Sequence, residues 1–330
     1  MLKISIVIPT YNRASLLFLT LENIIKQCKS LRTENSVEII VSDNASNDDT
    51  YQIVKELEAK LDWEIQYYRN DENIDDLNFI LSCGKTKGEF IWLFADDDLM
   101  EEGALVHVLN NLTTEIDLCI CNYSIWDDIF QKKIKEFRYP YLSDMHLKNR
   151  EDVLSKFGIG LQFISCNIFH RTLFERLNYS RCMLLRRDNN MHLYMLYSGL
   201  TRSSVIKYLS KPIVQYRGNL VNPPAPEIWN RIFIYSNFKF LKLLSLEKYS
   251  FYSRYVAADM IIKTYFISNI ISSRIRGYGR YETIKNVSYS LFLYPRFIFI
   301  CLPILLIPNK MLIGLKSLYF KIRPSKNIYY

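Results

Sequence analysis

The sequence predicts an α/β fold in which a mostly parallel central sheet is flanked by helices. Over the first 125 residues, short apolar segments alternate with segments whose apolar residues recur at helical spacing. The short segments are apolar throughout, as is typical of parallel strands that are covered on both faces. The 330 residues are 49% hydrophobic and 23% charged, which suits one large domain with an appendage, or two domains.

Five strands and four helices are expected to alternate in this first region. The strands are predicted at 4–8, 37–41, 65–68, 90–94 and 116–121. Apolar residues on one helical face predict helices at 17–28 and 53–61, and further helices are expected around 76–82 and 101–109. The carboxyl ends of such strands form the edge of the sheet at which ligands bind.

Polar segments follow four of the predicted strands, at 10–13, 43–46, 69–73 and 96–98. None is a glycine-rich phosphate loop, because GxGxxG and GxxxxGK[ST] are both absent and the chain has only 10 glycines. A dinucleotide-binding dehydrogenase and a P-loop nucleoside triphosphatase are therefore disfavoured.

The pattern is weaker after residue 150. Strands are expected at 161–169 and 212–216, a helix at 189–200, and a basic, aromatic, helical region from residue 228 onward. Three prolines within 222–226 mark a boundary, since proline continues neither a helix nor a central strand. We therefore expect one domain over 1–222, with parts at 1–125 and 126–222, and a C-terminal region over 223–330.

Charge divides the chain unevenly. Residues 1–150 carry a net charge of −10 and residues 151–330 a net charge of +18, which suggests a negatively charged partner for the second half. The seven cysteines follow no CxxC spacing and are expected to be reduced and buried in a cytosolic protein. The first residues are too soon interrupted by Pro9 for a signal peptide, and the apolar stretch 291–308 contains Arg296 and three prolines, so no membrane span is expected.

Asp96, Asp97 and Asp98 directly follow an apolar strand. Adjacent carboxylates repel one another, and a divalent cation that also binds phosphate oxygens relieves this repulsion. The alternative is a solvated acidic turn ahead of the next helix. Asp43 and Asn44 are equally open to a role as turn formers, and their segment lacks the glycine and glutamate of a calcium loop.

Three segments together resemble family 2 glycosyltransferases of the GT-A fold: 5–13 (SIVIPTYNR), 39–50 (IIVSDNASNDDT) and 88–98 (GEFIWLFADDD). Asn73 and Asn78, ahead of the acidic motif, are similar to the abequosyltransferase-like branch that builds O-antigen in lipopolysaccharide. Ala95 stands where the commonest family pattern, DxDD, has its first aspartate.

The resemblance implies a site that binds a nucleotide-sugar donor. The residues expected to bind the donor are Thr10, Tyr11, Arg13, Asp43, Asn44, Asn73, Asn78, Asp96 and Arg217. Asp43 would accept a hydrogen bond from a pyrimidine base, and Arg217 would steady the diphosphate or lie as a plain surface arginine. The implied metal is Mn²⁺ or Mg²⁺, with Asp97 as principal ligand and Asp98 and His192 beside it.

Two of these residues have alternative roles. Asp188 is the candidate general base of an inverting transfer, but it could instead cap the next helix or neutralise Arg186 and Arg187. His192 lies on an otherwise apolar helix and could be a packed core residue instead of a metal ligand.

The apolar run 297–307 and the basic residues beyond it resemble an interfacial membrane segment. Those basic residues are Lys310, Lys316, Lys321, Arg323 and Lys326. The alternative is a helix that packs on the catalytic domain or forms an oligomer contact. The resemblance implies a glycan acceptor linked to polyprenyl pyrophosphate, in O-antigen or capsule synthesis, and a cytoplasmic protein peripheral to the inner face of the membrane.

Two other function classes fit parts of the sequence. A nucleotidyltransferase that makes activated sugars would also place carboxylates and a metal at strand ends, but residues 10–16 contain no glycine for a triphosphate loop. The basic second half suits a nucleic-acid-binding protein, but its aromatic residues lie within apolar runs, and no nucleic acid is expected as a partner.

Overall fold

The computed structural model describes residues 3–31, 36–61, 63–218, 228, 230–284 and 289–314. Their contacts divide the chain into two units. The N-terminal unit comprises 1–153 and 160–219, and the C-terminal unit comprises 154–159 and 220–330. The proline-rich boundary at 222–226 lies outside the described residues.

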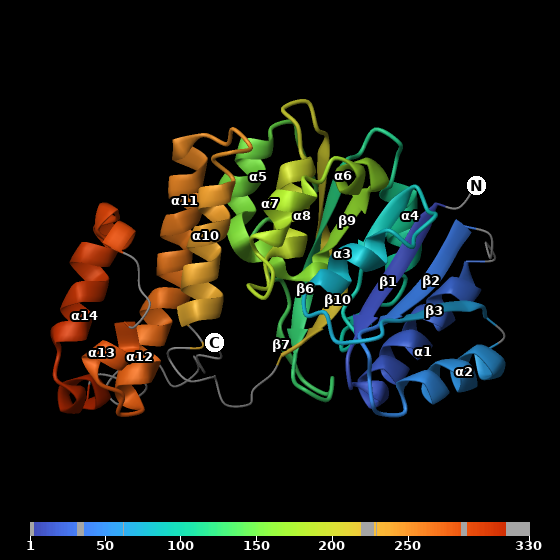
Figure 1. The fold of residues 1–330 in the computed structure, drawn as a ribbon, viewed down its shortest axis with the longest axis horizontal. Helices are drawn as coiled ribbons and strands as arrows, with labels where there is room; N and C mark the ends of the chain where they lie inside the picture. The colour runs from blue at the N-terminus through green and yellow to red at the C-terminus, as the bar shows by residue number, and fades with distance from the viewer. Residues whose placement is uncertain are drawn as a thin grey trace. The chain divides into compact units, whose positions relative to one another are not determined.

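The first half of the N-terminal unit alternates strand and helix as predicted (Figure 1). Its elements are β1 (Ile4–Thr10), α1 (Ala14–Ser30), β2 (Val37–Asp43), α2 (Thr50–Leu61), β3 (Ile65–Arg69), α3 (Leu77–Cys83) and β4 (Phe90–Leu93). The strands are parallel in the order β3-β2-β1-β4, and every residue of β1 and β2 is buried. The register sets Thr10 beside Asp43, so both strands end at the same edge of the sheet.

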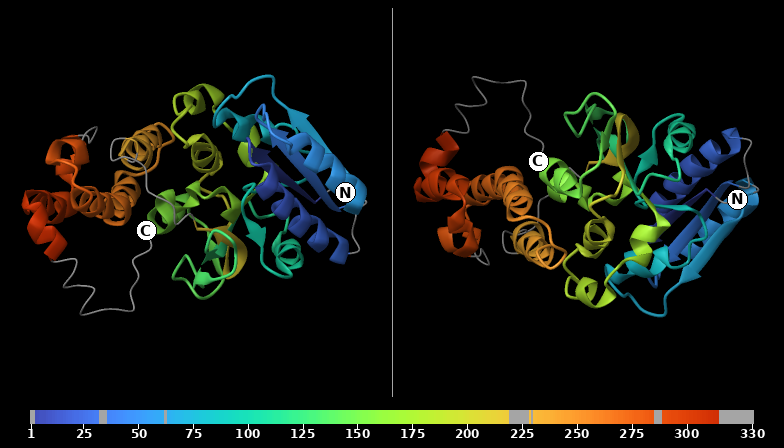
Figure 2. Two further views of the ribbon diagram at one scale, coloured as in Figure 1. Left: turned by 90° about the horizontal axis from the view of Figure 1, so that it is seen from below. Right: turned by 90° about the horizontal axis from the view of Figure 1, so that it is seen from above.

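Helices cover both faces of this sheet. The connections from β1 to β2 and from β2 to β3 run in one direction, and α1 packs against α2. The connection from β3 to β4 returns past both strands, so right-handed crossovers place α3 on the opposite face (Figure 2). Helix α1 packs on the sheet because its buried apolar residues lie on one face. These residues include Leu17, Leu21 and Ile24.

The second half of this unit makes the sheet mixed. Its strands are β5 (Leu99–Met100), β6 (Leu118–Trp126), β7 (Lys133–Lys135), β8 (Met145–Leu147), β9 (Asn167–His170) and β10 (Ile206–Arg217). Its helices are α4 (Ala104–Asn111), α5 (Arg150–Phe157), α6 (Arg171–Glu175), α7 (Tyr179–Met183) and α8 (Met191–Gly199). Two 3₁₀ turns, η2 (Gly158–Gln162) and η3 (Ile164–Cys166), belong to the same region. Part of α5 and part of η2 are assigned to the C-terminal unit. The sheet continues β4-β9-β6-β10-β5, and β9 is antiparallel to both of its neighbours. The α/β fold with a mostly parallel sheet is thereby confirmed.

The strand predicted at 161–169 is wrong for most of its length, because only β9 at its end is extended. The buried Asn167 side chain donates hydrogen bonds to the carbonyl oxygens of Leu161 (2.8 Å) and Phe163 (2.9 Å). These bonds satisfy carbonyl groups that a strand would otherwise pair with a neighbour, and so they stabilise the two 3₁₀ turns.

The C-terminal unit is helical, as expected for this region. Its elements are η4 (Arg231–Tyr235), α10 (Ser236–Leu243), α11 (Phe251–Ile261), η5 (Ile262–Phe266), α12 (Ile267–Ile275), α13 (Arg280–Ile284), η6 (Tyr289–Leu293), η7 (Phe297–Cys301) and α14 (Leu302–Leu306). A buried polar chain links three helical segments: Asn230 binds the carbonyl oxygen of Thr283 (2.8 Å) and accepts a bond from Asn269 (2.6 Å).

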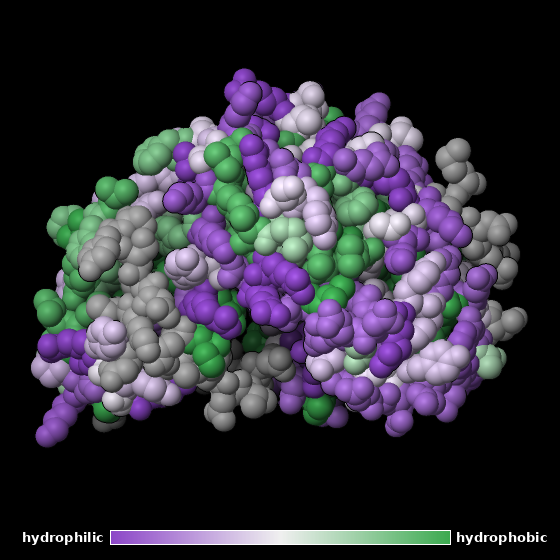
Figure 3. Space-filling view, in the orientation of Figure 1, coloured by the Kyte–Doolittle hydropathy of each residue, from purple (hydrophilic) through white to green (hydrophobic). Residues whose placement is uncertain are grey.

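The apolar run 297–307 divides between core and surface. Phe297 and Cys301 are buried, whereas Phe299 is 75% exposed and Leu306 is 67% exposed. Hydrophobic surface is visible over the region of α14 in Figure 3. Within the described part of the chain, no helix combines the length and hydrophobicity needed to cross a membrane. Lys310 lies just beyond α14, and Lys316, Lys321, Arg323 and Lys326 lie outside the described residues.

Candidate active site

The ends of β1 and β4 are joined by a cluster of Thr10, Arg13, Asp96 and Asp97. Thr10 donates a hydrogen bond to Asp96 (Oγ1 to Oδ2, 2.8 Å), and Arg13 Nη1 lies 2.9 Å from Asp96 Oδ1 and 3.1 Å from Asp97 Oδ2. Burial raises the pKa of Asp96 above its ordinary value, while Arg13 and the bond from Thr10 oppose that rise. The Arg13 side chain is 47% exposed, so its cation is available to a ligand at this edge.

The three adjacent aspartates have different surroundings. Asp98 is buried, accepts hydrogen bonds from Ser165 Oγ (2.6 Å) and the backbone N–H of Arg217 (3.2 Å), and has a pKa well above its ordinary value because of burial and of Asp97. Asp97 keeps 17% of its side chain exposed beside Arg13. The acidic turn thus presents Asp97 to solvent and holds Asp98 within the protein.

The donor set for a metal at this turn is small. The described residues contain no group of three His, Cys, Asp or Glu side chains arranged around a common point. Mg²⁺ and ions like it are commonly held by one or two carboxylates together with substrate phosphates. Asp97 beside Asp96 fits that arrangement, in which the diphosphate supplies the remaining oxygens.

Asp43 lies at the end of β2 with its carboxylate fixed from several sides. Its Oδ1 accepts the backbone N–H of Ser46 (2.9 Å), and its Oδ2 accepts a bond from the Tyr67 hydroxyl, with Arg69 Nε at 3.6 Å. Burial and the contact with Asp43 raise the pKa of Tyr67, so this hydroxyl stays protonated and donates. Asp43 is therefore held in one orientation at the edge of the sheet.

The segment with Tyr11 is tied to the loop that follows β2. Asn12 has a positive φ of 52°; its N–H binds Ser46 Oγ (2.9 Å), and its side chain accepts the N–H of Asn47 (2.7 Å). Tyr11 itself is 41% exposed. An exposed aromatic ring on a fixed loop is suited to stacking on a flat ligand group.

Asn44, Asn73 and Asn78 lie in one network of side-chain amides. Asn44 donates to Asn73 (2.9 Å), and Asn70 donates to both Asn44 and Asn78 (3.0 Å each). Asn78 also donates to the carbonyl oxygen of Ser42 (2.9 Å). The three predicted residues come together, and their amides hold the loops after β2 and β3 to each other.

Asp188 lies on a loop that Asp76 anchors. The Asp76 carboxylate accepts the backbone N–H groups of Arg187 (2.8 Å) and Asn189 (3.0 Å), both of which have positive φ. Arg187 also pairs with Asp75 (2.8 Å). The residue that precedes α8 is Asn190, not Asp188, so the helix-cap alternative does not hold.

His192 and Arg217 make contacts different from those of the cluster. His192 is buried, its Nε2 lies 2.8 Å from the carbonyl oxygen of Gln162, and burial lowers its pKa to about 4. These surroundings are those of a packed core residue, which was the alternative to a metal ligand for His192. The Arg217 side chain donates to the carbonyl oxygen of Asp128 (2.6 Å), while its backbone reaches Asp98.

Sequence reasoning missed Ser165, Tyr67 and Asp76, which position the predicted residues. The Ser165 hydroxyl binds Asp98 and accepts the N–H of Ala95 (2.9 Å), and its carbonyl oxygen accepts from Trp92 Nε1 (2.8 Å). Ser165 lies in a 3₁₀ turn with no motif around it. Of the three, Asp76 could best have been found from the sequence, because it is an acidic residue at the start of the helix predicted around 76–82.

Comparison with known proteins gives a consistent result. The sequence pattern of Glycosyl transferase family 2 matches residues 5–178. Abequosyltransferase RfbV of Salmonella typhimurium is 27% identical over 235 residues, which are 66% of this chain and 67% of that protein. A Campylobacter jejuni enzyme, GalNAc(5)-diNAcBac-PP-undecaprenol beta-1,3-glucosyltransferase, is 36% identical over 107 residues, which are 31% of this chain and 32% of that protein.

Solved structures share the fold. The S. aureus TarS 1–349 structure in complex with UDP aligns with a TM-score of 0.59 and 15% identity, over 88% of this chain and 77% of that one. A TarS 1–349 structure in complex with UDP-GlcNAc gives the same TM-score at 13% identity, over 88% of this chain and 78% of that one. With the strand-end motifs inside the matched region, the chain belongs to glycosyl transferase family 2 and is a nucleotide-sugar-dependent glycosyltransferase with the GT-A fold.

Proposed function

We propose that this enzyme transfers a sugar from a nucleoside diphosphate to a lipid-linked glycan in the synthesis of a bacterial surface polysaccharide, such as O-antigen or capsule. The observation that carries the proposal is the convergence of Arg13, Asp96 and Asp97 on one strand edge that Asp43 also reaches. The name of the Campylobacter relative, a glucosyltransferase acting on a PP-undecaprenol-linked glycan, supports this acceptor class.

On the donor side, Asp43 accepts a hydrogen bond from the base, and Tyr11 lies against the nucleoside. Arg13 faces the diphosphate. Mn²⁺ or Mg²⁺ would be held by Asp97, with Asp96 alongside, and when bound would stabilise the negative charge of the departing diphosphate. Because Asp98 is held by Ser165 and the Arg217 backbone, we assign it to fixing the acidic turn.

On the acceptor side, Asp188 takes the proton from the attacking hydroxyl group. The acceptor oxygen bonds to the anomeric carbon as the bond from that carbon to the diphosphate breaks, which inverts the configuration. Asp76 holds the loop of Asp188 through two backbone N–H groups. A carboxylate on a fixed loop meets the positional demand on a general base.

The basic second half suits an enzyme at the cytoplasmic face of a membrane. Residues 151–330 carry a net charge of +18, and the C-terminal unit exposes large apolar side chains such as Phe299 and Leu306. Basic and apolar residues together favour association with an anionic bilayer surface. We infer peripheral membrane association, which would bring the site close to a lipid-linked acceptor.

Titration calorimetry with nucleoside diphosphates, with and without Mn²⁺, tests the site. Asp97→Asn should abolish the gain in affinity that Mn²⁺ gives, whereas the control Asp71→Asn, at an exposed position in the loop after β3, should retain it. Retention of the gain in Asp97→Asn would contradict the assignment. NMR of the first-formed product reports the anomeric configuration, and a retained configuration would exclude Asp188 as a simple base.

A further inference from the structure

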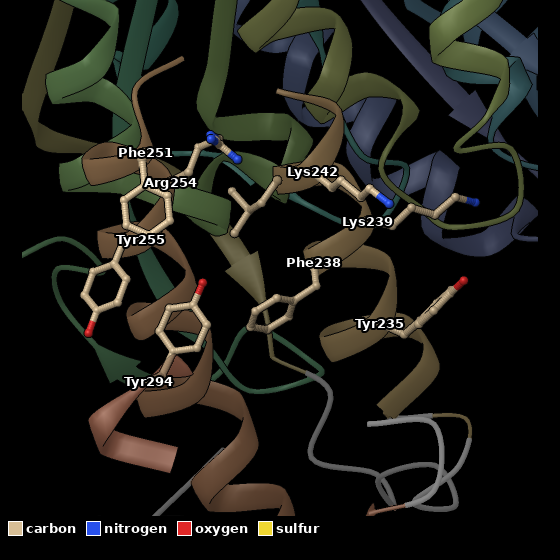
Figure 4. Close-up of a pocket in the computed structure, with 9 residues that line it drawn as sticks. Tyr235, Phe238, Lys239, Lys242, Phe251, Arg254, Tyr255 and Tyr294 are labelled. Carbon is tan, nitrogen blue, oxygen red and sulfur yellow. The ribbon is translucent and has the colours of Figure 1, made fainter. Parts of the chain in front are cut away.

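A cavity is lined by residues of the C-terminal unit. Its volume is about 540 Å³, within the range of small-molecule sites. It lies between η4–α10 and α11, with Tyr294 closing one side (Figure 4). Nine residues line it: Tyr235, Phe238, Lys239, Leu241, Lys242, Phe251, Arg254, Tyr255 and Tyr294.

Aromatic rings form a continuous wall of this cavity. Tyr255 stacks on Tyr294 with ring centroids 5.0 Å apart, and the Phe251 ring centroid lies 6.0 Å from that of Tyr255. Phe238 meets Tyr294 edge to face at 5.9 Å. Leu241 adds an aliphatic side chain, so this wall offers apolar surface to a ligand.

Three cationic side chains also line the cavity. In Figure 4 the ends of Arg254, Lys242 and Lys239 extend on one side, and the rings of Tyr255, Tyr294 and Phe238 lie on the other. Arg254 Nε is buried and has no hydrogen-bond partner within the described chain. A buried, unpartnered donor on a guanidinium group is costly unless a ligand satisfies it.

Charge around the cavity favours an anion. Asp259, on the same helix as Arg254, is already paired with Arg296 through hydrogen bonds of 2.9 to 3.0 Å. Neither Lys242 nor Arg254 forms an ion pair with an acidic side chain among the described residues. These two cations are therefore free to meet a negatively charged group.

The lining also limits the chemistry of the ligand. Among the nine residues there is no Asp, Glu, Asn, Gln, Ser or Thr side chain to read the edge of a base or the hydroxyl groups of a sugar. The cavity offers cations, aromatic and aliphatic surface, and tyrosine hydroxyl groups. A compact anion joined to an apolar chain satisfies all of these at once.

We propose that this cavity binds a phosphorylated or diphosphorylated lipid, with the anionic head at Lys242 and Arg254 and the first part of the apolar chain along Phe238, Tyr255 and Tyr294. The inference rests on the proposed function, in which the acceptor is lipid-linked, and adds the site that recognises the carrier. The site is distinct in sequence and in structural unit from the strand-end cluster that binds the donor.

Calorimetry on the full chain with three probes tests the proposal: farnesyl diphosphate below its micellar concentration, inorganic pyrophosphate, and farnesol. Farnesyl diphosphate should bind at least tenfold more tightly than either of the others, because only it supplies both head and chain. Comparable binding of pyrophosphate would overturn the lipid assignment and leave a simple phosphate site.

Variants then locate the binding. Lys242→Gln and the double variant Lys242→Gln/Arg254→Gln should weaken farnesyl diphosphate binding progressively, by at least tenfold in the double variant. Lys263→Gln, which removes an exposed cation elsewhere in the same unit, should leave it within twofold. Lys242 is exposed, so its single variant tests the site even if the double variant folds poorly. Equal binding by Lys242→Gln, the double variant and the Lys263→Gln control would overturn the proposal.

Two further measurements separate the alternatives. Nucleoside diphosphate binding, measured on the same preparations, should be unchanged in the cavity variants. If no preparation, including the wild type, binds nucleoside diphosphate, the proposed donor site is contradicted and not the cavity. Vesicles of phosphatidylcholine and phosphatidylglycerol, free of diphosphate lipid, test for general attraction to anionic membranes. Loss of vesicle binding in the double variant, with farnesyl diphosphate binding unaffected, would overturn the cavity assignment in favour of a membrane-facing surface.

Discussion

Arg13 and Asp96 form an ion pair of 2.9 Å across the ends of β1 and β4, and the same guanidinium nitrogen also reaches Asp97. The two strands are neighbours in the sheet, although the residues are 83 positions apart in the chain. One side chain therefore holds two carboxylates of the acidic turn in place and adds positive charge at the edge where we propose that the diphosphate binds.

Arg13→Gln should weaken nucleoside diphosphate binding by about tenfold, or roughly 1.4 kcal/mol, because a charge-assisted contact to phosphate is lost. Arg13→Lys should recover part of the affinity, since it restores the charge without the fork geometry. Calorimetry at low and high salt measures both. Unchanged affinity in Arg13→Gln would show that this cation does not face the donor.

Tyr67→Phe should loosen the carboxylate of Asp43 while leaving the aromatic ring in place. The lost hydrogen bond is to a charged acceptor, so the free energy of unfolding should fall by about 1.5 to 3 kcal/mol. Nucleoside diphosphate affinity should fall several-fold as well. Tyr68→Phe is the neighbouring control, because the Tyr68 hydroxyl binds only Gln66 at 3.2 Å among the described residues.

Asp76→Ala should reduce kcat by roughly tenfold while the KM for the nucleotide sugar stays within about twofold. The change frees the N–H groups of Arg187 and Asn189 and so releases the loop of Asp188, whereas the strand-end cluster is untouched. Steady-state kinetics measure the split. A rise in KM alone would place this loop on the donor side instead.

Gly88→Ala should destabilise the sheet. An added Cβ would lie 2.6 Å from the backbone nitrogen of Ser5 and 2.8 Å from the carbonyl carbon of Ile4, both on β1. Such overpacking typically costs about 1 to 3 kcal/mol, and backbone atoms cannot rotate away. In Gly314→Ala the added Cβ meets no atom of the described residues within 4 Å, so this variant serves as the control in urea unfolding. Equal stability of the two variants would contradict this close approach.

His192 should make stability depend on pH. Burial lowers its pKa to about 4 in the folded protein, whereas in the unfolded chain it binds a proton near pH 6.5. The unfolded state therefore takes up more protons as the pH falls through this window, and the free energy of unfolding should fall by on the order of 3 kcal/mol from this group.

His192→Gln should flatten that decline, because glutamine does not titrate and its amide can still donate to Gln162. Urea unfolding at pH 7 and at pH 4.5 compares the two proteins. His146→Gln, at an exposed position, should keep the wild-type dependence. A wild-type decline in the His192→Gln variant would assign the effect to other groups.

The sequence alone determined the alternation of strand and helix, the parallel direction of the first four strands, and the acidic and polar segments at their ends. These features follow from local periodicity and from the rule that ligands gather at the carboxyl ends of parallel strands. The sequence therefore suffices to place Thr10, Asp43 and Asp96 at one edge of the sheet.

Only the tertiary structure decided which side chains position that site and which predicted site residues lie elsewhere. Ser165 binds Asp98 across 67 positions, and Asp76 fixes the loop of Asp188 across more than 110, contacts that no local pattern encodes. The antiparallel insertion of β9 and the burial of His192 were likewise settled by long-range packing. Hydrogen bonding and desolvation depend on which groups the fold brings within a few ångströms of one another. The spacing of residues along the sequence does not give those distances.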